Sequence, residues 1–287
     1  MEIITAVRDM QSKAKQLRRE GKSIVVVPTM GFLHEGHLSL IEVARTIADV
    51  VVTTLFVNPT QFGPDEDFER YPRDQKRDEQ LAEHAGTDIL FAPDTKEMYP
   101  PGHRTVVVTE GISTVLEGKF RPMHFRGVTT VVAKLFHIVK PHHAVFGQKD
   151  AQQVAVIRRM IEDLNMDVGL IIAPILREDD GLAMSSRNVY LDPAERKNAT
   201  ALYRTLLSVK EFVGRGERDV SVLRREMTAL LNEAGHSGID YVTFVDKETF
   251  EEVSRLEGPE VVALLAVRFG KTRLIDNMII PVTPETP

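Results

Sequence analysis

Cysteine is absent from the 287 residues of this chain. Its absence excludes disulfides, zinc sites built on thiolates, thioester carriers and cysteine nucleophiles. Long apolar runs are also missing: none approaches the roughly 20 residues that a membrane span needs, and the first twenty residues are too charged for a signal peptide. We therefore expect a cytoplasmic protein that does not bind membranes.

Runs of lysine or arginine are missing as well, and the net charge is -6 with a pI near 5.9. This charge balance argues against nucleic acid or an anionic membrane surface as the main partner. Any cations that serve a ligand should therefore be sought locally, in particular loops.

The hydrophobic pattern predicts a doubly wound α/β domain followed by a smaller α+β domain. Up to about residue 174, apolar runs alternate with amphipathic segments, which is typical of parallel strands joined by helices. The predicted strands are 23–27, 50–56, 88–91, 143–146 and 168–173. From residue 192 onward we expect helices at 193–213 and 220–234, strands at 239–245, 261–267 and 272–275, and a frayed tail at 282–287.

The segment from Pro28 to Leu40 predicts a phosphate site. It joins a buried strand to a helix through a glycine-containing turn, so the unpaired amides of the helix start would face a ligand. His34 and His37, three apart, share one helix face, and Gly36 between them lets a ligand approach the backbone. The structural alternative is that the two histidines cap the helix and are ordinary polar residues of its solvent-exposed surface. The zinc motif of metalloproteases is excluded because it needs two histidines four apart.

Three further loops follow predicted strands or precede a helix. The loop at 57–64 carries Gln61, whose amide could hold a hydroxyl or a carboxylate. Residues 65–74 are expected to be a solvated helix start, with a role of their acids in binding magnesium as the alternative. The segment 119–127 holds three cations before a predicted helix at 128–139, which is compatible with a path for anions or with ordinary loop packing.

Two later segments also carry side chains that are suited to binding a ligand. Gly147 to Gln153 again gives a strand end, a glycine and a helix start, with Lys149 and Gln153 on one helix face. A lysine at a helix start opposes the helix dipole, which makes a purely structural role less expected. Ser185, Ser186 and Arg187 form a donor cluster suited to phosphoryl oxygens.

Together these features predict a cradle for a nucleoside triphosphate, with neutral glutamines left for a small polar substrate. A P-loop and an evident covalent nucleophile are both missing. The chemistry would then consist of positioning an attacking group in line and stabilising charge at the α-phosphorus, which is nucleotidyl transfer.

The motifs carry a resemblance to a known family. Met30–His37 resembles the first signature of the class I synthetase-like nucleotidyltransferases, and Met184–Arg187 resembles a variant of the second. With residues 28–31, 56–64, 147–153, 183–188 and 272–277, the chain resembles the pantothenate synthetase (pantoate-β-alanine ligase) family nearly end to end. Met123 departs from that pattern, which has glycine before the His-Phe pair.

The resemblance implies a fold, a reaction and partners. The fold would be a Rossmann-like nucleotide- and substrate-binding domain at 1–175 and a smaller α+β domain at 176–287 that carries the Met-Ser-Ser-Arg loop. Pantoate would attack the α-phosphate of magnesium ATP to give pantoyl adenylate and pyrophosphate. The amine of β-alanine would then displace AMP to give pantothenate. A homodimer is implied as well.

The resemblance also implies roles for particular residues. Gln61 would hold pantoate and meet β-alanine, and Gln153 would hold pantoate. The catalytic set would be His34, His37, Lys149, Ser185, Ser186 and Arg187, with His37 usually given an acid role that we interpret as charge stabilisation. Magnesium ligands are not assigned. The ATP site would comprise Met30, Gly31, Phe32, Leu33, His34, Glu35, Gly36, His37, Gly147, Gln148, Lys149, Asp150, Leu176, Met184, Ser185, Ser186 and Arg187.

Two other functions remain compatible with the sequence. A related nucleotidyltransferase acting on another small acid or on a phosphate ester is one; for a phosphate ester its acceptor pocket should contain cations rather than Gln61 and Gln153. A non-catalytic nucleotide-sensing module is the other, and it would not need Lys149 together with His37 and the serine-arginine loop.

Overall fold

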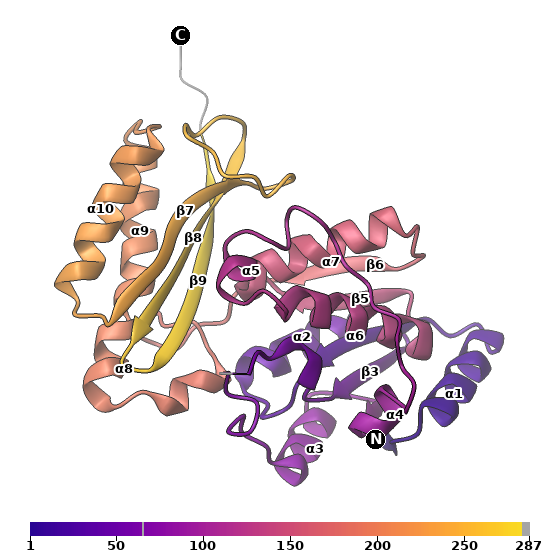
Figure 1. Cartoon of the computed structure of the whole chain (residues 1–287). Coiled ribbons are helices and arrows are strands. Elements are labelled where there is room, and N and C mark those ends of the chain that lie inside the picture. The colour runs from indigo at the N-terminus through magenta and orange to yellow at the C-terminus, as the bar shows by residue number, and fades with distance from the viewer. Residues whose placement is uncertain (65, 283–287) are drawn as a thin grey trace. The chain divides into compact units, whose positions relative to one another are not determined.

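The computed structural model describes residues 1–64 and 66–282, which form two compact units (Figure 1). Unit 1 comprises Met1–Gln148 and Gln152–Pro174, and unit 2 comprises Lys149–Ala151 and Ile175–Pro287. The expectations for Asp65 and for 283–287 concern positions outside the described residues. Val282 is buried against the core of unit 2, so the prediction of a tail starting at this residue is wrong.

Unit 1 contains one sheet of six parallel strands in the order β1-β4-β3-β2-β5-β6. The five predicted strands are confirmed to within one or two residues at each end, and the α/β fold class is confirmed with them. The strands are β1 (Glu2–Ile4), β2 (Ile24–Thr29), β3 (Val50–Leu55), β4 (Ile89–Phe91), β5 (His143–Gly147) and β6 (Gly169–Ala173).

The central strand β2 shows how the sheet is covered. Ile24 and Val26 contribute to one apolar cluster, whereas Val25 and Val27 contribute to another, because successive side chains of a strand point to opposite faces. Helices α1, α6 and α7 supply the first cluster, and α2 and α3 the second. The helices of unit 1 are α1 (Val7–Arg19), α2 (Glu35–Arg45), α3 (Gln75–His84), α4 (Thr95–Met98), α5 (Glu117–Phe120), α6 (His124–Val139) and α7 (Ala151–Asp163), the last beginning at the unit boundary.

Three details of unit 1 differ from the prediction. Strand β1 was missed because it has three residues at the sheet edge, of which only Ile4 is buried. Strand β2 continues through Pro28, which is tolerated because β2 pairs with β5 only at Val25 and Val26. Helix α6 begins at His124 instead of residue 128.

Unit 2 is an antiparallel sheet of β7 (Gly238–Asp246), β8 (Glu260–Phe269) and β9 (Thr272–Pro281), packed with α9 (Ala201–Gly214) and α10 (Val220–Glu233). The predicted α+β character is confirmed. The single helix expected at 193–213 is wrong, since α8 (Pro193–Ala199) ends before α9 begins. Strand β9 extends beyond the predicted end at residue 275. The prediction stopped there because Asp276 and Asn277 interrupt the apolar pattern, although both residues are buried.

No helix in the described ranges combines the length and the hydropathy of a bilayer-crossing segment.

Candidate active site

The sheet of unit 1 has its topological switch point at β2. The chain goes from β2 to β3 and β4 on one side, while β5 and β6 lie on the other side. In open α/β sheets, ligands bind at the carboxyl ends of the strands at such a point. The loops after β2, β3 and β5 carry Met30–His37, Gln61 and Gly147–Gln148, and Gln153 follows on α7. The fold therefore brings these predicted site residues of unit 1 to one edge of the sheet.

The turn after β2 has an unusual backbone. Gly31 has φ +87°, and Phe32 adopts φ +50°, a left-handed conformation that is uncommon for a residue with a side chain. A Cβ atom on Gly31 would lie 2.8 Å from Leu55 Cδ1, so glycine is required for space as well as for conformation. The turn therefore lies directly against the carboxyl end of β3.

Asp78 of α3, which was not predicted as a site residue, holds this turn. Its carboxylate accepts hydrogen bonds from the N–H groups of Phe32 and Leu33, both at 2.7 Å. Burial raises the pKa of Asp78, and the two N–H donors act in the opposite direction. The available signal was its spacing: Asp78 lies four residues before the buried Ala82, so an acid occupies the apolar face of α3.

His34 and His37 cap helix α2 reciprocally. His34 is the N-cap residue, and its Nδ1 accepts from the N–H of Gly36 at 3.1 Å; Nδ1 of His37 accepts from the N–H of His34 at 3.4 Å. The two ring centroids lie 4.0 Å apart. Because both Nδ1 atoms accept, the neutral rings carry their protons on Nε2. Capping is thus confirmed as one role of the pair, and ligand binding stays a prediction.

Gln61 lies in the short helix η1 (Pro59–Gln61) and is almost completely buried. Its amide orientation is set by neighbours: Asn58 donates to Oε1 at 3.1 Å, and Nε2 lies 2.9 Å from the sulfur of Met30. Tyr99 in turn donates its hydroxyl to Oδ1 of Asn58 at 2.9 Å. A glutamine held in this way is pre-oriented to donate through Nε2 toward the β2 loop.

The segment 119–127 packs on the Gln61 loop, which favours the structural alternative for part of it. The guanidinium of Arg121 is paired with Glu66, and His124 Nδ1 lies 3.0 Å from the carbonyl oxygen of Gln61. A Cβ on Gly127 would lie 2.4 Å from the carbonyl oxygen of Thr60, so the two segments are in direct backbone contact. Met123 is exposed.

The described part of the mixed-charge segment, 66–74, forms turns and bends, so the expectation of a helix start there is wrong. Helix α3 begins only at Gln75, and Asp74 is its N-cap. Across 1–64 and 66–282, no group of three or more potential metal ligands is assembled.

Neighbouring glutamines on α7 have different environments. Gln152 is buried, donates to the carbonyl oxygens of Ile112 and Val115, and accepts from the N–H of Glu117. Gln153 is half-buried and forms no side-chain hydrogen bond with the described parts of the chain. Gln152 therefore fixes the 112–117 turn, whereas the amide of Gln153 remains available to a ligand.

The predicted residues of unit 2 lie on a hairpin and on the segment 149–151. Arg177 pairs with Ala183, and the N–H of Met184 donates to the carbonyl of Leu176 at 3.0 Å. This hairpin leads into η3 (Ser186–Tyr190), where Ser185 Oγ is the cap and accepts from the N–H of Arg187. Lys149 lies in the helical turn η2 (Gln148–Asp150) immediately before α7, as its predicted place at a helix start requires.

Strand β9 supports both segments of unit 2. Asn277 donates to the carbonyl oxygen of Lys149 at 2.9 Å. Asp276, almost fully buried, accepts two hydrogen bonds from the guanidinium of Arg177 at 2.6 and 3.0 Å. Burial raises the pKa of Asp276, and Arg177 opposes that shift. Asp276 and Asn277, whose polarity prevented the prediction of this part of β9, thus hold the 176–184 hairpin and the backbone of Lys149.

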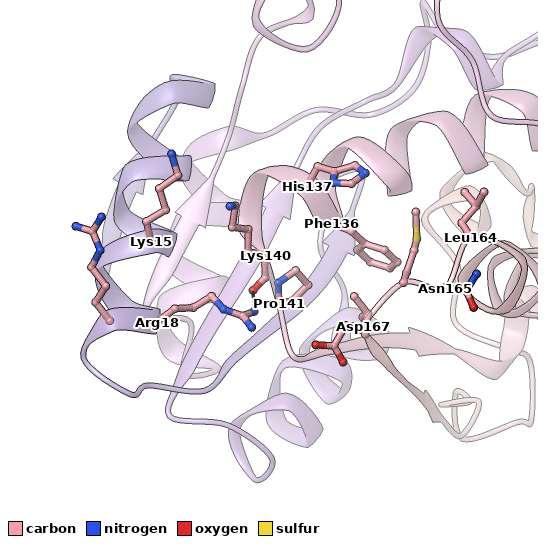
Figure 2. A pocket seen from close by; sticks show the side chains of 12 residues that line it. Lys15, Arg18, Phe136, His137, Lys140, Pro141, Leu164, Asn165 and Asp167 are labelled. Atoms are coloured by element: carbon pink, nitrogen blue, oxygen red, sulfur yellow. Dashed lines mark hydrogen bonds between the residues drawn. The ribbon is translucent and has the colours of Figure 1, made fainter.

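A groove of about 780 Å³ lies elsewhere on unit 1, where α1, α6 and α7 end (Figure 2). Arg18 donates to the carbonyl of Lys140 at 2.7 Å, and Lys15 and His137 also line the groove. Arg18 lies in the last turn of α1, where a cation stabilises the helix dipole, so this residue has a structural explanation. The groove contains none of the predicted site residues.

Comparison with known proteins identifies the family. A family model described as pantoate-beta-alanine ligase matches residues 2–279. The chain is 54% identical over 282 residues to the pantothenate synthetase of Acetivibrio thermocellus, with 98% of this chain and 100% of the relative covered. It is 54% identical over 280 residues to that of Geobacter sulfurreducens, with 98% and 99% covered.

Two solved structures are similar over almost their whole length. The pantothenate synthetase of Thermus thermophilus superposes with a TM-score of 0.92 at 45% identity, covering 97% of this chain and 99% of that one. The pantoate-beta-alanine ligase of Francisella tularensis, solved with beta-gamma ATP and beta-alanine, gives 0.80 at 34% identity and covers 97% of each chain. The chain therefore belongs to the pantoate-β-alanine ligase family, whose reaction forms an amide bond.

Proposed function

We propose that this chain condenses pantoate with β-alanine in two steps through a pantoyl adenylate. A carboxylate oxygen of pantoate attacks the α-phosphorus of ATP and pyrophosphate leaves. The β-alanine amine then attacks the acyl carbon, loses a proton, and AMP leaves. Family membership supports the overall reaction. The location of the active site is supported by one observation: the loops after β2, β3 and β5 all lie at the switch point of the sheet.

In unit 1, the β2 loop is assigned to phosphate binding. The backbone of Gly31 and Phe32, held by Asp78, approaches the strand edge, and the amides at the start of α2 favour an anion there. The Nε2–H groups of His34 and His37 would donate to phosphate oxygens. Their role is charge stabilisation, because donors fixed before the reaction are not reorganised as the transition state forms.

The neutral glutamines are assigned to pantoate. Gln61, oriented by Asn58, and Gln153, which has no side-chain partner in the described chain, offer amides to a hydroxyl or carboxylate. In unit 2, Lys149 and the Ser185–Arg187 loop are assigned to the nucleotide phosphates, with Leu176 and Met184 beside them on the hairpin. A related transferase acting on a phosphate ester is less well supported, because the substrate loops of unit 1 present amides instead of cations.

Three further assignments rest on the family resemblance. Magnesium would enter bound to the ATP phosphates, where it would neutralise charge, since the described residues offer it no assembled carboxylate cage. We propose that the protein is a homodimer and acts in the cytosol.

Isotope exchange tests the order of steps. Pantoate alone should support exchange of labelled pyrophosphate into ATP, without β-alanine, because the adenylate forms first. Exchange that strictly requires β-alanine would contradict the order, and formation of ADP in the full reaction would reject nucleotidyl transfer. An acceptor screen in the same assay would separate pantoate from other small acids.

A further inference from the structure

The groove where α1, α6 and α7 end has a charge opposite to that of the chain as a whole. Four lysine or arginine side chains and one aspartate line it: Lys15, Arg18, Arg19, Lys140 and Asp167. The chain, by contrast, has a net charge of -6. Because a cleft with charges of one sign and apolar walls raises the local concentration of ions of the opposite sign, this groove attracts anions.

The cations of the groove have no carboxylate partner in the ranges 1–64 and 66–282. Lys15, Arg19 and Lys140 form neither an ion pair nor a side-chain hydrogen bond there, and the guanidinium of Arg18 is bonded to the carbonyl oxygen of Lys140. Burial lowers the pKa of His142, two residues after Lys140, and the charge of Arg18 acts in the same direction. An anion that enters the groove would therefore meet donors that are still available.

Lys140 has a backbone conformation that suits glycine. It is the C-cap of α6 with φ +49°, in the left-handed region, where the Cβ atom is crowded by the backbone. Glycine is the usual residue at such a helix end. A cation there also stabilises the helix dipole, but a residue of the last turn such as His137 is placed to do so without left-handed backbone. Strain of this kind is commonly kept where the side chain has a function.

The other wall of the groove is apolar. Leu164, directly after α7, is 52% exposed, and Met166 and Val168 in the segment leading to β6 are only partly buried. Figure 2 shows Lys15 on one side of Lys140 and Leu164 on the other. The groove volume of about 780 Å³ falls within the range of small-molecule sites, roughly 300–1,000 Å³. Cations and an apolar surface thus meet in a space of the size of a small ligand.

We propose that this groove binds a small phosphate monoester with an apolar body. The phosphate, with nearly two negative charges at neutral pH, can accept from Lys140 and from the cations of α1 together. The apolar body would cover Leu164 and Met166 and remove their surface from water. An anionic membrane surface fits less well, because the groove is concave and the whole chain is negatively charged. The site is separate from the active site, since no residue assigned to ATP, pantoate or β-alanine lines it.

Calorimetric titration of the full chain with 1-naphthyl phosphate tests the proposal. The dissociation constant should be about 0.1 mM or lower, which is within reach of a ligand of this size. Inorganic phosphate and 1-naphthol each contain only one half of the probe, and both should bind at least about tenfold more weakly. Added salt should weaken the binding of 1-naphthyl phosphate, because the cations of α1 are exposed.

Substitution of Lys140 separates binding from folding. Lys140→Gly should weaken 1-naphthyl phosphate about tenfold, as expected for the loss of one charge-assisted contact. The same variant should unfold at no lower urea concentration than the wild type, because glycine adopts φ +49° without crowding. Asn165→Gly is the matched control: Asn165 lines the same groove with φ +50° but is uncharged, so its replacement should leave the affinity unchanged.

Four outcomes would each overturn the proposal. Wild-type affinity in Lys140→Gly would show that the lysine takes no part in binding, and an equal loss in Asn165→Gly would attribute the effect to the backbone. A loss in Lys149→Met as large as that in Lys140→Gly would place the probe in the nucleotide site. Inorganic phosphate that binds as tightly as 1-naphthyl phosphate would show that the apolar wall is not used.

Discussion

At the scale of single residues, Lys149 carries the sharpest mechanistic assignment. It lies at a helix start, where its charge opposes the helix dipole, and its backbone carbonyl is held by Asn277. As pantoate attacks, negative charge grows on the α-phosphate oxygens, and a fixed cation there binds the transition state more strongly than ground-state ATP. The proposed catalytic role would explain this position of the charge, which also acts on Asp276 and opposes the rise in the pKa of that carboxyl caused by burial.

Lys149→Met should lower the rate of adenylate formation about a hundredfold, the scale for losing one pre-positioned charge-stabilising donor. ATP affinity and folding should change far less, since methionine keeps much of the apolar stem. Single-turnover formation of pantoyl adenylate alongside ATP titration measures both, with Lys197→Met on α8 as the control. A defect fully restored by excess ATP would reduce Lys149 to a binding residue.

At the scale of elements, substitution can separate the observed capping role of the start of α2 from its proposed role in binding phosphate. His34 caps the helix through Nδ1, and its Nε2–H is assigned to phosphate. Asparagine is one of the preferred N-cap residues but lacks the imidazole donor, whereas alanine lacks both functions.

His34→Asn should therefore unfold at nearly the same urea concentration as the wild type, and His34→Ala should lose about 0.5–2 kcal/mol of stability. Both should adenylate pantoate more slowly. Urea titration and single-turnover kinetics on the same preparations decide between the roles. If His34→Asn is as active as the wild type, the histidine serves only as a cap.

Helix α7 offers an internal control for the substrate site. Gln152→Ala should destabilise the fold by about 1–3 kcal/mol, because it removes the hydrogen-bond partner of the buried N–H of Glu117 and of the partly buried carbonyl of Ile112. Gln153→Ala should leave stability unchanged and weaken pantoate binding without weakening ATP binding. Calorimetric titration of both ligands tests this, and an equal loss for ATP and pantoate would refute the assignment of Gln153.

The elements that the sequence predicted are those with a strong hydrophobic period. Strands β2, β3 and β5 are buried on both faces and appear as apolar runs, so their ends, and with them the loops that carry Gln61 and Gly147, could be located. Strand β1 and the polar part of β9 lack that signal. Asp78 could not be assigned to the β2 loop, because its contact with Phe32 joins positions 46 residues apart.

At the scale of the whole chain, the same limit applies to the support of Lys149. The hydrogen bond from Asn277 to its carbonyl spans 128 positions and joins the last strand to a segment that the sequence places after β5. The resemblance to the family marks residues 272–277 as one of its motifs. Only the fold shows that Asn277 and Asp276 hold the backbone of Lys149 and the side chain of Arg177, in segments that are assigned to nucleotide binding. The C-terminal strand is thus a positioning element for residues far away in the chain.

This arrangement predicts that Asn277→Ala acts on the first chemical step without removing any group that touches a substrate. The freed Lys149 carbonyl should let the lysine shift, and adenylate formation should slow about tenfold, since small displacements of a catalytic group are costly. Stability should fall by about 1–3 kcal/mol, because Asn277 is buried.

Asn198→Ala is the matched control: its amide also donates to a backbone carbonyl in unit 2, that of Gly235, but at an exposed site away from segment 149–151. In single-turnover experiments at saturating ATP, adenylate formation should be slower in Asn277→Ala and unchanged in Asn198→Ala. In Lys149→Met, the further change Asn277→Ala should slow adenylation little, because the side chain that it positions is already missing. Full additivity of the two effects would show that Asn277 acts by another route.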